Sequence, residues 1–205
     1  MTQEQFDSYN LPSVTTILSD VFGNGEFANI PKRVLDAACD RGHAVHESIE
    51  EFIKIGCKDK PTIALEYQIY IDYFNDWYDK YKPEFIFSEQ KIVSEKLGTK
   101  GIIDTLYFEK YSDELIMCDW KTSSSLNVFK TKCQLNLYLL LLEEAQPSYK
   151  VDKLKILSLT KSGYKYYEFE PDRELAKAIL KIYKEKHKDG KWIKFCSKNK
   201  KIFKR

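Results

Sequence analysis

Apolar residues alternate with polar ones along one short segment in the middle of the chain, and a second apolar segment follows after a turn. The first segment, GIIDTLYF, begins at Gly101, and the second, LIMCDWK, ends at Lys121; the residues between them, EKYSDE, favour a turn. Because side chains two apart on a strand point to the same face, Asp119 and Lys121 should project together, opposite Trp120. Pairing of the two strands would bring Asp104 close to both charged groups.

Apolar residues recur at three- and four-residue spacing in five further segments, and this period predicts helices. The expected helices lie within residues 11–22, 31–56, about 62–81, about 127–145 and about 171–187, and Ser13 or Thr15 could cap the first. Three more segments, FIFSEQKIVSE, KLKILSLT and YKYYEFE, read as strands. The order of elements predicts one α/β domain over residues 1–205, with a central mixed β-sheet flanked by helices.

Composition narrows the class of protein. The 205 residues suffice for one domain with a sizeable core, and the 33 basic and 31 acidic side chains nearly cancel. No apolar run approaches the roughly 18 residues of a membrane span. The first ten residues carry no Lys or Arg, so we expect neither a signal peptide nor a mitochondrial presequence, and a cytoplasmic location. The five cysteines form no C-x-x-C pair, which favours free thiols.

The predicted hairpin carries the strongest candidate chemistry. Asp119 and Lys121 follow an apolar run that should be buried, where an unpaired charge is costly, and Asp104 follows an apolar pair on the preceding strand. Carboxylates supply the hard oxygen ligands that Mg²⁺ or Mn²⁺ prefers. A nearby lysine can orient water or offset the charge of a phosphate. The combination is typical of phosphodiester hydrolysis.

Polar residues on two of the predicted helices allow two interpretations each. His46 lies beside an apolar stripe and shares a helix face with Glu50, so it is either a satisfied boundary residue or an additional metal ligand. Gln134 and Tyr138 are four residues apart on a leucine-rich helix. They are either boundary residues or side chains that reach into a site.

The end of the chain is strongly basic. Nine Lys and Arg residues fall between Lys186 and Arg205, against one acidic residue, and aromatic residues are interleaved with them. This composition suits a phosphate backbone and stacked bases, although a solvated charged tail would have the same composition. The candidate nucleic-acid-binding residues of the segment 186–205 are Lys191, Trp192, Lys194 and Lys198.

Five motifs occur in an order that resembles the PD-(D/E)xK nuclease superfamily and, within it, the RecB-type exonucleases. They are RGHAVHE at 41–47, SEQKI at 88–92, GIID at 101–104, DWKTS at 119–123 and QLNLY at 134–138. The chain looks most similar to phage-type and mitochondrial genome maintenance exonucleases, which also carry a segment like SVTTIL near the N-terminus. The resemblance implies a restriction-endonuclease-like core.

The resemblance also implies roles for individual residues. Asp104 and Asp119 would hold a catalytic Mg²⁺, for which Mn²⁺ could substitute, Lys121 would be the catalytic lysine, and His46 would add a metal ligand. Supporting or substrate-binding positions would be Arg41, Glu89, Thr122, Ser123, Gln134 and Tyr138. Several RecB-type relatives carry four cysteines for an iron–sulfur cluster, and because the spacing here differs we expect no such cluster.

The implied function is that of a metal-dependent DNA exonuclease that prefers single-stranded ends and acts in replication, recombination or repair. The helicase domains of larger relatives are absent from the sequence, which favours DNA that is already unpaired, in the cytoplasm of a bacterium or a phage-infected cell. Three alternatives stay open: a structure-specific endonuclease of the same superfamily, a non-catalytic nucleic-acid-binding protein, and a small structural protein.

Overall fold

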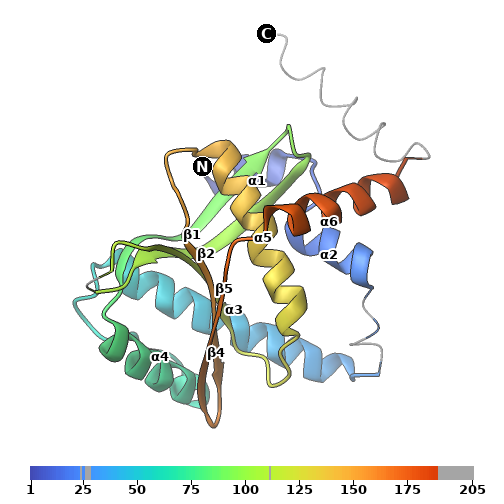
Figure 1. Ribbon diagram of the computed structural model, residues 1–205. Helices are drawn as coiled ribbons and strands as arrows, with labels where there is room; N and C mark the ends of the chain where they lie inside the picture. Colours follow the sequence, from blue (N-terminus) through green and yellow to red (C-terminus); the bar gives the residue numbers. More distant parts are fainter. Residues whose placement is uncertain (24, 26–28, 111, 189–205) are drawn as a thin grey trace.

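The computed structural model describes residues 1–23, 25, 29–110 and 112–188. Its centre is a five-stranded mixed sheet in the order β1 (Glu84–Ser94), β2 (Thr99–Phe108), β3 (Leu115–Lys121), β4 (Lys153–Thr160) and β5 (Gly163–Phe169) (Figure 1). The pairs β1–β2, β2–β3 and β4–β5 are antiparallel, and β3–β4 is parallel. A crossover that contains a helix joins the parallel pair, as parallel pairing requires. The predicted fold class and the hairpin are confirmed.

Helices cover both faces of this sheet (Figure 1). On one face lie α2 (Val14–Phe22), α5 (Val128–Ala145) and α6 (Arg173–Lys186), and on the other α3 (Lys32–Lys54) and α4 (Gln68–Tyr81). The core under α5 is mostly aliphatic, whereas the core under α4 is built around aromatic rings such as Phe74, Trp77 and Trp120. A short helix, α1 (Gln3–Ser8), which the apolar period did not predict, precedes the layers.

Capping side chains, proline and glycine explain where α2, α3 and α5 begin or end. Ser13 caps α2, since its hydroxyl accepts a hydrogen bond from the Thr16 N–H at 3.1 Å, so of the two residues considered Ser13 is the cap. Asn127 caps α5 in the same way, through the Lys130 N–H. Pro31 precedes α3, and Gly56, at φ +76°, follows its end.

The predicted helix over 62–81 is wrong in its first turn. The chain forms a 3₁₀ turn, η2 (Leu65–Tyr67), and the α-helix begins only at Gln68. The carbonyl of Thr62 accepts a hydrogen bond of 2.9 Å from the Ser48 hydroxyl of α3. This contact holds the segment before Leu65 against α3, so its main chain is engaged in tertiary bonding instead of helical bonding.

The expectations on membrane spans, on the basic C-terminal segment and on the cysteines can be compared with the described residues only in part. None of the helices that the structure describes combines the length and apolarity that a bilayer crossing needs. The candidate binding residues Lys191, Trp192, Lys194 and Lys198 lie outside the described residues, which end at Lys188. Cys196 lies there too, and the other four cysteines are free thiols.

Candidate active site

Two buried carboxylates lie where β2 and β3 separate. The last register pair toward this end joins Thr105 to Cys118, so Asp104 and Asp119 follow directly on the two strands. They are 8% and 1% exposed. Asp104 lies two residues from Leu106 and Asp119 two residues from Met117, which both belong to the core under α5, so the two carboxylates face that side of the sheet.

Asp119 lacks the partners that a buried carboxylate needs. Its nearest cation is Lys121, whose Nζ lies 2.5 Å from Oδ2, as the strand period predicted. Neither oxygen accepts a hydrogen bond of regular geometry from the described residues. Burial raises the pKa of Asp119 to about 6; Lys121 opposes this rise and Asp104 adds to it. Burial disfavours the charged form of Lys121, yet the two carboxylates raise its pKa, so it is an ammonium.

The main chain of Trp120 holds two of the candidate ligands. Its N–H donates a hydrogen bond of 2.7 Å to Oδ2 of Asp104, and its carbonyl lies 3.0 Å from Nε2 of His46. A carbonyl only accepts, so Nε2 carries the ring proton. The other nitrogen, Nδ1, then faces Oε1 of Glu89 at 3.1 Å and Oδ2 of Asp104 at 3.7 Å. Both ring nitrogens of His46 thus have partners, and Nδ1, which faces the two carboxylates, is the nitrogen that would bind a metal; the role of His46 as a metal ligand stays a prediction.

The electrostatics of His46 reflect these neighbours. Burial lowers its pKa, but the charges of Asp104 and Glu89 outweigh burial and raise the pKa to about 9. Without a cation, Nδ1 is protonated between two carboxylates. Glu50, the residue predicted to share a helix face with His46, forms an ion pair with Lys54 at 2.5 Å instead. The partner of His46 comes from β1, which the helical period could not indicate.

Glu89 reaches the site through an unusual backbone conformation. It lies between the register pairs Ser88–Thr105 and Gln90–Ile103, at φ +50°. A left-handed conformation at a residue other than glycine costs on the order of 1–3 kcal/mol and occurs preferentially at functional sites. Here it accompanies a carboxylate directed at His46.

The donor set fits a divalent cation. One ligand atom each from His46, Glu89 and Asp104 lies within 4.8 Å of the others. The Asp119 carboxylate, which is paired with Lys121, is close enough for the charges of Asp104 and His46 to shift its pKa. Carboxylate oxygens suit Mg²⁺ and Mn²⁺, and a histidine that donates its other N–H to a main-chain carbonyl is a typical metal ligand.

The residues predicted to support the site or bind substrate differ in where they lie. Gln134 and Tyr138 come together on α5, where the Gln134 amide donates to the Tyr138 hydroxyl at 3.0 Å. Tyr138 packs so closely on β2 that a Cβ at Gly101 would lie 2.6 Å from its ring. Thr122 is buried directly after β3. Arg41, in contrast, lies over the Tyr70 ring at 5.5 Å, toward α4.

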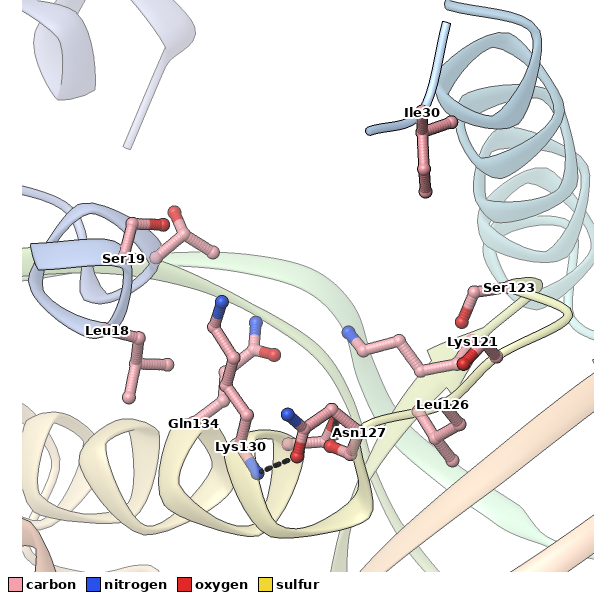
Figure 2. A pocket seen from close by; sticks show the side chains of 12 residues that line it. Leu18, Ser19, Ile30, Lys121, Ser123, Leu126, Asn127, Lys130 and Gln134 are labelled. Carbon is pink, nitrogen blue, oxygen red and sulfur yellow. Dashed lines mark hydrogen bonds between the residues drawn. The ribbon is translucent and has the colours of Figure 1, made fainter. Parts of the chain in front are cut away.

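A cavity of about 570 Å³ adjoins Lys121 between α2 and α5 (Figure 2). Its lining includes Ser123 and Gln134, which the sequence motifs indicated. It also includes residues that sequence reasoning missed, namely Thr15, Ser19, Asn127 and Lys130. The polar residues at 127, 130 and 134 share one face of the leucine-rich helix, and this spacing was a usable signal.

A mixed sheet flanked by helices, with His46, Glu89, Asp104, Asp119 and Lys121 close together, is typical of nucleic acid hydrolases. A family model described as the PD-(D/E)XK nuclease superfamily matches residues 24–197. The chain therefore belongs to this superfamily, is a nuclease, and takes nucleic acid as its substrate; the resemblance to RecB-type exonucleases fits this result.

Of the solved structures compared with the chain, the first described here agrees with it at the level of the fold. A candidate exonuclease from Eubacterium rectale has a TM-score of 0.52 at 13% identity, over 96% of this chain and 86% of that chain. An alkaline exonuclease from Laribacter hongkongensis has a TM-score of 0.49 at 10% identity, over 91% and 93%. The protein SSO0001 is 19% identical, with a TM-score of 0.37, and the match covers 60% of this chain and 59% of that one. Among curated proteins, none matches the chain.

Proposed function

We propose that this nuclease is a Mg²⁺-dependent DNA exonuclease that acts on free ends, prefers single strands, and serves replication, recombination or repair. The observation that carries the proposal is the convergence of His46, Glu89, Asp104, Asp119 and Lys121, in which the buried Asp119 carboxylate has the Lys121 ammonium beside it and no hydrogen bond of regular geometry from the described residues. A cation stabilises carboxylates that are buried close together, and a divalent cation suits these oxygen and nitrogen donors.

Each residue then has a definite task. When bound, a divalent cation supplies Lewis-acid polarisation of the phosphate and acidifies a water molecule. Asp104, Asp119 and His46 would hold it, and the Trp120 main chain fixes two of these three. Lys121, an ammonium beside Asp119, donates an N–H to orient the attacking water and offsets charge that develops on the phosphate.

Two observations support a single-stranded end as the substrate. The cavity beside Lys121, about 570 Å³, falls within the roughly 300–1,000 Å³ of small-ligand sites, a scale that suits one or two nucleotides better than a duplex. The similar structure from Eubacterium rectale is described as a candidate exonuclease, and the motifs resemble small exonucleases. We further propose that residues 1–205 form a single nuclease domain, that Mn²⁺ substitutes for Mg²⁺, and that the protein acts in a bacterial or phage-infected cytoplasm.

One assay tests the proposal directly. Linear single-stranded DNA, linear duplex DNA and covalently closed single-stranded circles, at equal nucleotide concentration, are incubated with Mg²⁺ and resolved by product length. We expect mononucleotides or short products from linear single strands and none from the circle. Rapid cutting of the circle would instead establish an endonuclease. Binding without metal-dependent cleavage would establish a non-catalytic nucleic-acid-binding protein.

A further inference from the structure

Two aromatic side chains lie exposed on the helices that line the cavity, and no step of the proposed hydrolysis uses them. Phe22 ends α2 and Phe129 lies in the first turn of α5. Their ring centroids are 5.9 Å apart with the planes at 83°, an edge-to-face contact. The two residues are 43% and 56% exposed. Large aromatic residues usually bury most of their area, so this pair is an apolar surface patch of its own.

The pair belongs to the two helices that line the cavity. Phe22 follows Leu18 and Ser19 by four and three residues and so shares their face of α2. Phe129 adjoins Lys130 on α5. Leu18, Ser19 and Lys130 line the cavity, where Figure 2 shows the two helices facing each other. The Phe22–Phe129 contact therefore joins the two cavity walls.

The cavity lining carries both charged and apolar side chains. Lys121 and Lys130 extend their side chains into it, and Ser123 lies beside Lys121 (Figure 2). Leu18, Ile30 and Leu126 line it as well. A nucleotide also combines a charged phosphate with a planar base whose faces are apolar.

We infer that Phe22 and Phe129 form a stacking platform for a base of the strand whose phosphate lies at Lys121. The inference rests on the proposed function and adds to it how an unpaired strand is selected. Stacking on aromatic rings tolerates any base, because every base has a π-face. In a duplex, each base is stacked between its neighbours and paired, so its faces are not free for the platform. The platform then favours single strands at the binding step.

Kinetics on a single-stranded oligonucleotide with Mg²⁺ test this inference. We expect Phe22→Ala and Phe129→Ala each to raise KM about tenfold, at the scale of one lost base–aromatic stack, and to change kcat by less than about twofold. Phe129→Tyr keeps the ring and should match wild type, whereas Phe129→Leu keeps apolar volume and should behave like alanine. Ile182→Ala, which removes a 49% exposed apolar side chain from α6, is the matched control. Melting temperatures verify that every variant is folded.

A modified substrate separates stacking from other effects. Oligonucleotides with abasic sugars in the three terminal positions, at either end in turn, should raise the wild-type KM about tenfold. The Phe22→Ala/Phe129→Ala double variant should lose less than about twofold further. Wild-type KM values in the alanine variants, or equal losses on intact and abasic DNA, would overturn the platform while leaving the exonuclease proposal standing. A wild-type protein that cleaves no DNA with any divalent metal would overturn both.

Discussion

Asp119 on β3 pairs in register with Ile156 on β4, beside Lys155, so two buried charges lie on neighbouring strands and face opposite sides of the sheet. Lys155 belongs to what we call the paired cluster, Glu109, Lys155, Tyr166 and Glu168. Asp119 belongs to the acidic cluster, His46, Glu89, Asp104, Asp119 and Lys121. Both clusters join a lysine to carboxylates. They differ in burial, since Glu168 is 52% exposed and Asp119 is 1% exposed, and in whether their charges are satisfied.

The paired cluster is complete in itself. Nζ of Lys155 lies 2.7 Å from Glu109 and 3.1 Å from Glu168, and 4.9 Å above the Tyr166 ring. The Tyr166 hydroxyl donates to Glu109 at 2.8 Å and contacts the Tyr107 hydroxyl. The acidic cluster instead leaves oxygens of Asp119 without regular hydrogen bonds and directs one histidine nitrogen at two carboxylates. A polar cluster that serves stability satisfies its own groups, whereas one that serves binding leaves groups for the ligand.

The largest expected effect concerns catalysis at the acidic cluster. Asp119→Asn and Lys121→Met should each lower the cleavage rate about a thousandfold or more, because they remove a metal ligand and a charge-stabilising donor. Asp119→Asn should not lower the melting temperature of the metal-free protein, since it removes one of two buried carboxylates that repel each other. Lys121→Met should lower it, because Asp119 then loses its nearest cation. Parallel measurement of turnover and thermal unfolding checks both parts. A large loss of stability in Asp119→Asn would assign Asp119 to the same class as the paired cluster.

The second effect concerns stability at the paired cluster. Lys155→Ala leaves Glu109 without its closest cation and should destabilise the fold by about 3 kcal/mol. Cleavage per folded molecule should stay close to wild type. Lys153→Ala is the control, because its partners Glu168 and Glu170 are largely exposed and such pairs contribute about 0–1 kcal/mol. Urea unfolding gives both values, and equal losses in the two variants would remove the distinction between the clusters.

The third effect concerns metal affinity. His46→Ala should require about tenfold more Mg²⁺ or Mn²⁺, a loss at the lower end of that seen when a metal site is perturbed. The rise of melting temperature with metal concentration reports this affinity without turnover, since a ligand that binds the folded state stabilises it. The wild type and Lys155→Ala should share one metal dependence. If His46→Ala keeps that dependence and is merely less stable, His46 is a boundary residue.

The smallest expected effect concerns the hydrogen bond between Gln134 and Tyr138 on α5, next to the site. Tyr138→Phe removes the hydroxyl to which Gln134 donates, and the Gln134 amide can turn to the adjoining cavity. We expect a loss of about 1 kcal/mol or less in stability and a change of a few-fold in cleavage rate. Calorimetry and initial rates measure the two. A thousandfold loss would place Tyr138 within the acidic cluster itself.

Sequence patterns were sufficient where the site is local. The strand period and the turn residues predicted the hairpin, and the two-residue spacing placed Asp119 and Lys121 on one face, where they now form an ion pair. Ser13 and Asn127 have the side chains that cap helices, and both do so.

The patterns failed where distant segments meet. The contact between His46 and Glu89 joins residues 43 positions apart and depends on how α3 docks against β1, which no periodicity encodes. The early start of the fourth helix was predicted from amphipathic spacing, but a tertiary bond from Ser48 overrides that preference. The sequence patterns also did not indicate that α2 lines the cavity, because this too depends on how distant segments pack.

The antiparallel order of β1, β2 and β3 has a consequence for folding. Three of the acidic cluster's members, Glu89, Asp104 and Asp119, are collected by strands adjacent in sequence, whose pairing closes short loops early. His46 and the parallel partner β4 arrive over longer loops. Pairing of β1, β2 and β3 would therefore bring together three carboxylates and only one of their counter-charges, Lys121, before His46 docks. We expect salt, which screens such repulsion, to speed refolding of the wild type, and to do so less for Glu89→Gln, as stopped-flow fluorescence can measure.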